Sequence, residues 1–97
     1  MSKILKWLEK HNIAYTFGKV KGCKCERITI TLEKGCVWIN GFGQTMKYNK
    51  EITITKSLSY GTYHVQEVTG MSLSKGLCTS TKQTDVIVIL EERFVLK

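Results

Sequence analysis

Lysines stand close to aromatic residues at two places in the first half of the chain. Lysine ammonium groups attract the phosphates of a nucleic acid, and aromatic rings stack on its unpaired bases. This combination of residue types predicts binding of single-stranded DNA or RNA with little preference for base sequence. In order of preference, the candidate residues are Lys47, Tyr48, Lys50, Lys19, Lys21, Lys24, Phe42 and Trp38.

Several of these aromatic residues and their neighbours also have a purely structural interpretation. Tyr15 and Phe17 alternate as core-facing strand residues do, so we expect them to pack in the core. Trp38 alternates with Val37 and Ile39, and it is either covered by a helix or exposed as a stacking platform. The lysines also fit the solvated face of a sheet, where they discourage pairing with other chains.

The positive charge of the chain is concentrated in residues 1–56. This segment contains eleven basic and four acidic residues and carries the whole net charge of +7, whereas residues 57–97 contain four of each. Such asymmetry favours a polyanionic partner. Thirteen of the fifteen basic residues are lysines, which neutralise phosphates as point charges, whereas arginine reads base edges with a planar fork. A genome of low GC content would produce the same excess of lysine.

The residues that usually carry catalysis are few and scattered. His11 and His64 occur in no known nucleophile motif. The segment 41–43 (Gly-Phe-Gly) lacks the third glycine of a phosphate-binding loop. Glu91 and Glu92 would point to different faces of a helix, which argues against a two-metal site. We therefore expect a non-enzymatic protein without a cofactor.

The four cysteines are interpreted through the compartment of the chain. The longest apolar run, residues 86–90, is far shorter than the roughly 20 residues of a transmembrane helix, and charged residues interrupt any signal peptide behind Lys3. A cytoplasmic location without membrane contact is therefore expected, and free thiols with it. The Cys-x-Cys spacing at 23–25 is too tight for a zinc knuckle, and Cys36 and Cys78 stand alone, so no metal site is predicted.

Hydrophobic periodicity predicts the elements that would position these residues. A helix is expected over residues 3–11 with Ser2 as its cap, and a basic turn over 18–25. A hairpin turn is expected at 33–35. The C-terminal segment favours a helix over residues 81–94, with a strand over 85–90 as the alternative. The expected strands cover residues 13–17, 27–32, 36–40, 51–55 and 62–69.

The sequence therefore predicts one α+β domain over residues 1–97. It would contain an N-terminal helix, an antiparallel sheet of about four to five strands and a C-terminal helix, with both helices on one face of the sheet. The functional hypothesis is a sequence-tolerant accessory protein for single-stranded nucleic acid. The alternative is a protein-interaction module, either an accessory subunit or an inhibitor of a partner enzyme, that binds an acidic protein. Steep salt dependence of binding would favour the first hypothesis. The oligomeric state leaves no trace in the sequence.

Overall fold

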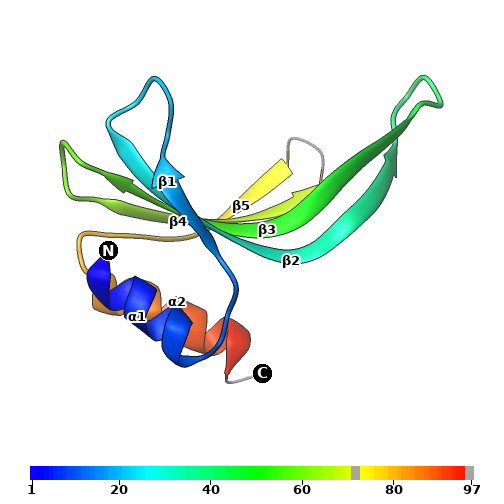
Figure 1. Ribbon diagram of the computed structural model, residues 1–97. Helices are drawn as coiled ribbons and strands as arrows, with labels where there is room; N and C mark the ends of the chain where they lie inside the picture. Colours follow the sequence, from blue (N-terminus) through cyan, green and yellow to red (C-terminus); the bar gives the residue numbers. More distant parts are fainter. Residues whose placement is uncertain (71–72, 96–97) are drawn as a thin grey trace.

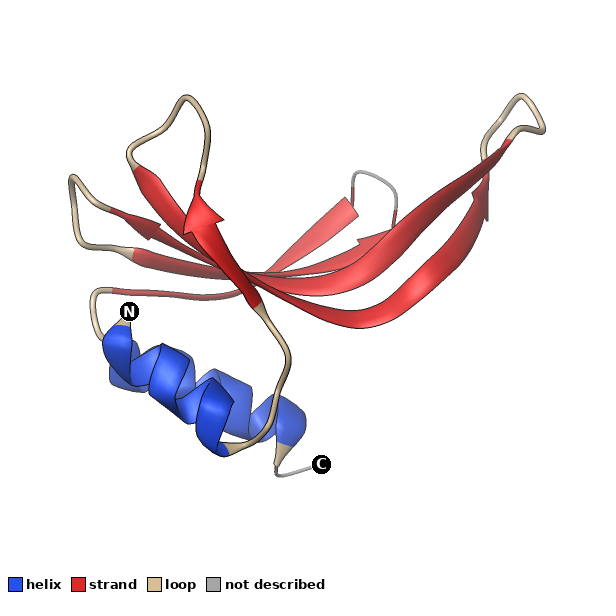
Figure 2. Ribbon diagram, in the orientation of Figure 1, coloured by secondary structure: helices blue, strands red, loops and turns tan. Residues whose placement is uncertain are grey.

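The computed structural model describes residues 1–70 and 73–95. Its five strands form one sheet in the order β1-β2-β3-β4-β5, and all neighbouring strands are antiparallel. Both helices lie on the same face of this sheet (Figure 1, Figure 2). The α+β architecture predicted from the sequence is therefore confirmed. The elements are α1 (Ser2–Lys10), β1 (Thr16–Lys19), β2 (Cys25–Ile39), β3 (Thr45–Ser57), β4 (Tyr63–Gly70), β5 (Leu73–Ser80) and α2 (Gln83–Phe94).

The core lies between the helices and the middle of the sheet. Isoleucines alternate with threonines in both central strands, and the segments 27–31 and 51–55 pair with each other. Ile28 stands opposite Ile54, and Ile54 stands opposite Val65 of β4. Because residues directly opposite share a face, the isoleucines all point toward the helices. Each such side chain contributes about 1.5–3 kcal/mol when it is fully buried.

Helix α1 packs on this layer through its apolar stripe. Ile4, Trp7 and Leu8 are buried, as their helical spacing predicts. The helix ends where Asn12 adopts the left-handed conformation with φ of 55°, which asparagine accepts more readily than most residues.

The beginning of α1 is capped by the other helix. The cap residue is Met1, without a capping side chain, so the predicted Ser2 cap is wrong. Instead, Oε1 of Gln83 in α2 accepts hydrogen bonds from the backbone N–H groups of Lys3 (2.9 Å) and Ile4 (3.3 Å). These bonds satisfy two of the N–H groups that a helix start leaves unpaired, and they link the first turns of the two helices.

Helix α2 confirms the helical interpretation of the C-terminal segment. Val86 and Leu90 are buried and Phe94 packs against the core, which matches their spacing of four residues along a helix. Ahead of the helix, Ser80 Oγ donates a hydrogen bond to Asp85 (2.6 Å) and accepts one from the backbone N–H of Lys82 (3.1 Å). The strand alternative over residues 85–90 is therefore wrong.

The hairpin turn predicted at residues 33–35 is wrong, because the chain passes through this segment as a bulge. Gly35 has φ of 68°, and the register between β2 and β3 shifts between Glu33 and Cys36. The backbone N–H of Gly35 donates to Asn49 Oδ1 at 3.1 Å, which satisfies a donor that the bulge removes from the ladder. As a result, β2 continues to Ile39.

The true hairpin turn lies at residues 40–44, and β3 begins at Thr45 rather than at residue 51. The ends of other strands also differ from the prediction. β1 starts later than expected, and β5 follows a sequence without clear alternation and was not predicted as a strand.

The distal parts of β2 and β3, from Glu33 to Lys50, form a two-stranded ribbon that we call the arm. It curves away from the helix layer and reaches well beyond it (Figure 1). The molecule accordingly measures 43 × 34 × 19 Å along its principal axes. No helix in residues 1–70 or 73–95 has the length and apolar character needed to cross a membrane.

Candidate nucleic-acid interface

The structure divides the predicted site residues between the two ends of β2. Lys19, Lys21 and Lys24 lie at the β1–β2 turn, before the start of β2 or in the last position of β1. The other five candidates, Trp38, Phe42, Lys47, Tyr48 and Lys50, lie on the arm. Since β2 is 15 residues long, the two groups do not form one continuous site.

The arm has apolar side chains on both faces. Cys36 stands opposite Tyr48 and Trp38 opposite Met46, so these four residues share one face. Trp38 was expected to be either covered by a helix or exposed. It is 44% exposed, so the second position is correct.

The other face of the arm combines aliphatic and basic residues. Val37 stands opposite Lys47, and Ile39 stands opposite Thr45. Val37 and Ile39 are both exposed. Strand periodicity does not predict this exposure, because an apolar run such as 36–39 is equally typical of a buried strand.

The tip of the arm is held by Asn40. Its Oδ1 accepts hydrogen bonds from the backbone N–H groups of Phe42 (2.9 Å) and Gln44 (3.0 Å), and its Nδ2 donates to Gln44 Oε1 (3.0 Å). Gly43 completes the turn with φ of 77° and donates to the Asn40 carbonyl (3.0 Å). The result is an ordered turn that presents Phe42 with 92% of its surface exposed. The Asn40-Gly41 dipeptide is a typical hairpin signal and could have located this turn.

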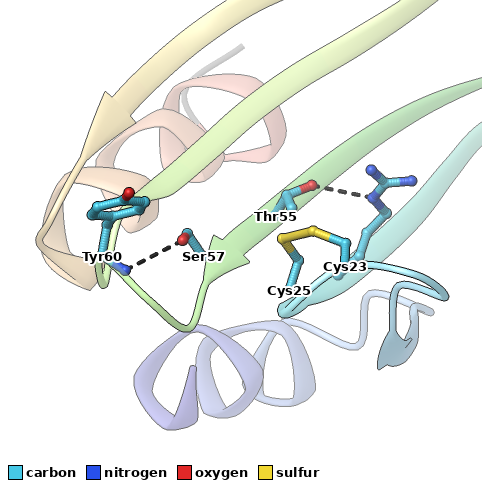
Figure 3. Close-up of a disulfide and its surroundings, with 6 residues drawn as sticks. Cys23, Cys25, Thr55, Ser57 and Tyr60 are labelled. Carbon is cyan, nitrogen blue, oxygen red and sulfur yellow. Dashed lines mark hydrogen bonds between the residues drawn. A yellow bond between two sulfur atoms is a disulfide. The ribbon is translucent and has the colours of Figure 1, made fainter.

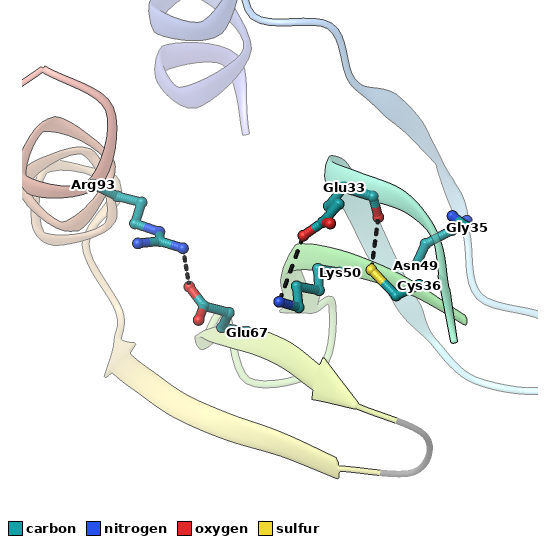
Figure 4. Close-up of polar contacts among 7 residues, drawn as sticks. All are labelled: Glu33, Gly35, Cys36, Asn49, Lys50, Glu67 and Arg93. Atoms are coloured by element: carbon teal, nitrogen blue, oxygen red, sulfur yellow. Dashed lines mark hydrogen bonds and ion pairs between the residues drawn. The ribbon is translucent and has the colours of Figure 1, made fainter. Parts of the chain in front are cut away.

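The base of the arm carries an ion pair. Lys50 Nζ lies 3.5 Å from Glu33 Oε2, next to the hydrogen bond from Gly35 to Asn49 (Figure 4). This pair screens part of the Lys50 charge. Within the described part of the chain, Lys34 and Lys47 form no ion pair, so they are the more available cations of the arm.

The β1–β2 turn offers a second basic surface, but with less aromatic area. Phe17 stands opposite Ile28 and therefore lies on the helix side of the sheet, yet it is exposed rather than packed in the core. The core position predicted for Phe17 is therefore wrong. Tyr15 does pack against the core, and its hydroxyl donates a hydrogen bond to Glu9 at 2.9 Å. This bond raises the pKa of Tyr15 above its usual value.

The cysteines differ from the expected set of free thiols. Cys23 and Cys25 are joined by a disulfide in the β1–β2 turn (Figure 3). Cys36 and Cys78 are free, and burial raises the pKa of the Cys78 thiol. In residues 1–70 and 73–95, no three His, Cys, Asp or Glu side chains come close enough together to hold a metal ion.

The two histidines lie far from the arm and from each other. His11 stacks on Trp7 with ring centroids 4.1 Å apart, at the end of α1. His64 lies on the sheet face away from the helices, where its Nδ1 is 3.3 Å from Thr79 Oγ1.

Comparison of the chain with protein-family models, with curated proteins and with solved structures finds no match.

Proposed function

We propose that the chain is a non-enzymatic accessory protein that binds single-stranded nucleic acid through the arm. The observation that carries this proposal is the presence of two exposed aromatic side chains, Trp38 and Phe42, on the same protruding ribbon as the exposed Lys47. An exposed ring on an ordered turn contributes little to the core. It is well suited to stack on a base, which contributes about 1–3 kcal/mol per stacked base.

The basic residues of the arm would supply the remaining attraction. Lys34, Lys47 and Lys50 outnumber the single carboxylate of Glu33, so the arm has a positive balance. Each neutralised phosphate of a single strand changes the slope of log K against log salt by about −0.7, so three contacts give a slope of roughly −2. Ammonium groups do not distinguish bases, and binding is therefore expected to tolerate many sequences.

A single strand suits the arm better than a duplex does. Base faces are stacked on each other within a duplex, whereas a single strand can place them against Phe42 or Trp38. The chain also has only two arginines, the residue that most often reads guanine in a duplex groove.

A salt series with labelled single- and double-stranded oligonucleotides tests this proposal. Replacing Lys34 and Lys47 by glutamate should weaken binding of the single strand at least about 10-fold at low salt and flatten the salt slope. The matched control replaces Lys6 and Lys10, two exposed lysines of α1, by glutamate. It makes the same change in net charge away from the arm and should have a much smaller effect. Equal losses in both variants would contradict an arm-based site.

The exposed aliphatic residues of the arm favour a second candidate, a protein-interaction module with an acidic partner. Base stacking requires aromatic rings and does not use the aliphatic side chains of Val37 and Ile39. A protein partner, in contrast, would bury these two exposed residues. β1 pairs only as far as Thr29, so the outer edge of β2 beyond this residue lacks a neighbouring strand among the described residues and can accept an added one. If the protein binds no oligonucleotide even at low salt, this candidate replaces the first.

A further inference from the structure

The disulfide between Cys23 and Cys25 lies where a covalent link adds little to the fold. Its two cysteines are only two positions apart. A disulfide that closes a short loop removes less conformational entropy from the unfolded chain than one that closes a long loop, and it therefore stabilises the fold less. The turn is already closed by backbone hydrogen bonds, from the Val20 N–H to the Cys25 carbonyl (2.9 Å) and from the Cys23 N–H to the Val20 carbonyl (3.3 Å). Its presence therefore calls for an explanation other than stapling the sheet.

The two cysteines differ in their exposure. Cys23 is exposed, whereas Cys25 is half-buried as the first residue of β2, opposite Ser57. Figure 3 places the bridge beside Ser57 and Thr55, on the sheet face away from the helices. An incoming thiol can therefore reach the sulfur of Cys23 without opening the core.

The surroundings of the bridge are positively charged. Lys24 stands between the two cysteines and Lys21 two positions before Cys23, and both lysines are exposed. Arg27 shares the sheet face of Cys25, two residues further along β2. The carboxylate nearest in sequence, Glu26, lies on the opposite face between Lys19 and Lys56 of the neighbouring strands. An anion approaching Cys23 would thus meet a cationic surface, which speeds its encounter with the sulfur.

We propose that the Cys23–Cys25 bridge is a thiol–disulfide exchange site that reacts preferentially with anionic thiols. Exposed disulfides are generally the labile and regulatory ones, and nearby cations stabilise a departing thiolate. The substrate class is a low-molecular-weight or protein thiol that carries negative charge beside its sulfur.

The reaction balances with two equivalents of thiol. A thiolate attacks the sulfur of Cys23, which forms a mixed disulfide and releases Cys25 as a thiolate. A second thiolate attacks the sulfur that the first reagent contributed, and Cys23 leaves as a thiolate. The protein gains two electrons, and the two thiol molecules leave as their own disulfide.

Reduction by two simple thiols of opposite charge tests the proposal. Wild-type protein is treated with 2-mercaptoethanesulfonate, which is anionic, or with cysteamine, which is cationic, at equal concentrations of thiolate. Alkylation and peptide mass spectrometry then follow Cys23 and Cys25, while Cys36 and Cys78 serve as internal free thiols. The anionic reagent should act about 10-fold faster at low salt, and the difference should shrink at high salt.

Charge variants locate the source of this preference. Replacing Lys21 and Lys24 by glutamine should bring the two rates close together. The matched control replaces Lys6 and Lys10, two exposed lysines of α1, by glutamine and should leave the rates unchanged. Circular dichroism of both variants checks that they fold.

Three results would overturn the proposal. The first is complete alkylation of Cys23 and Cys25 in protein never exposed to a reductant, which means that no bridge forms. The second is equal reduction by the two thiols in wild-type protein. The third is a preference that survives the loss of Lys21 and Lys24. None of these results depends on nucleic-acid binding, so each of the two proposals can be contradicted without affecting the other.

Discussion

The same two strands behave differently in the two halves of β2 and β3. Under the helices, Ile54 of β3 is 0% exposed, whereas on the arm Ile39 of β2 is 65% exposed. Both residues belong to apolar-rich strand segments with strong β propensity. What separates them is the presence or absence of a covering helix, which the strand sequence itself does not encode.

Element lengths explain why the helices leave the arm uncovered. α1 has 9 residues and α2 has 12, which correspond to roughly 14 and 18 Å of helix. β2 has 15 residues, or roughly 50 Å of strand. Helices of this length can cover only about a third of the strand, so the rest must remain exposed or be covered by a partner. This shortfall is the physical reason why we propose the arm as the binding region.

The largest expected contrast concerns stability. Ile54→Ala removes a buried side chain between the sheet and the helices and should lower the free energy of unfolding by about 2–5 kcal/mol. Ile39→Ala makes the same chemical change on the arm and should alter it by less than about 0.5 kcal/mol. Urea denaturation followed by circular dichroism measures both. A comparable loss in Ile39→Ala would mean that the arm is packed against something in solution.

A smaller effect is expected at the tip of the arm. Asn40→Ala removes the oxygen that accepts hydrogen bonds from the backbone N–H groups of Phe42 and Gln44. The change should lower the free energy of opening the turn at the tip by about 1 kcal/mol. Chymotrypsin should then cleave after Phe42 several-fold faster than in the wild type. Asn49→Ala is the matched control, since it removes a hydrogen bond to Gly35 in the bulge rather than at the tip. If cleavage after Phe42 is unchanged in Asn40→Ala, the tip is not ordered by this side chain.

The smallest expected contrast is between the two ion pairs, which Figure 4 shows together. Arg93 of α2 lies 3.0 Å from the less exposed carboxylate of Glu67, whereas the Lys50–Glu33 pair on the arm is longer and more exposed. Glu67→Gln should therefore lower the free energy of unfolding by roughly 0.5–1 kcal/mol, and Glu33→Gln by no more than about 0.5 kcal/mol. Thermal denaturation at low and high salt measures this difference. A larger loss of stability in Glu33→Gln than in Glu67→Gln would contradict this prediction, because the ion pair on the arm would then stabilise the fold more than the pair between β4 and α2.

The elements that the sequence predicts well are those in which periodicity and burial agree. The Ile-Thr alternation at 28–31 and 52–55 identifies the central strands, and the apolar stripe with Ile4 and Leu8 identifies α1. The hairpin turn was misplaced because Gly35, a residue typical of turns, serves a bulge instead. β5 escaped detection because Gly76 and a register shift against β4 interrupt its alternation.

The candidate site was predictable only as a set of residue types. Lys47, Phe42 and Trp38 were identified individually, but their separation from the lysines of the β1–β2 turn depends on how far β2 extends. That length depends on the bulge at 33–35, where the sequence predicts a hairpin turn instead. The exposed faces of Val37 and Ile39 depend on helix lengths and positions, and strand periodicity carries no information about these.

The most direct test of the arm as the binding region is a map of backbone amide chemical shifts during titration with a short single-stranded oligonucleotide. We expect the largest shifts from Lys34 to Lys50, centred on Phe42, and small shifts in α1 and α2. Shifts concentrated at Lys19–Lys24, or the absence of any shift at low salt, would contradict the central claim.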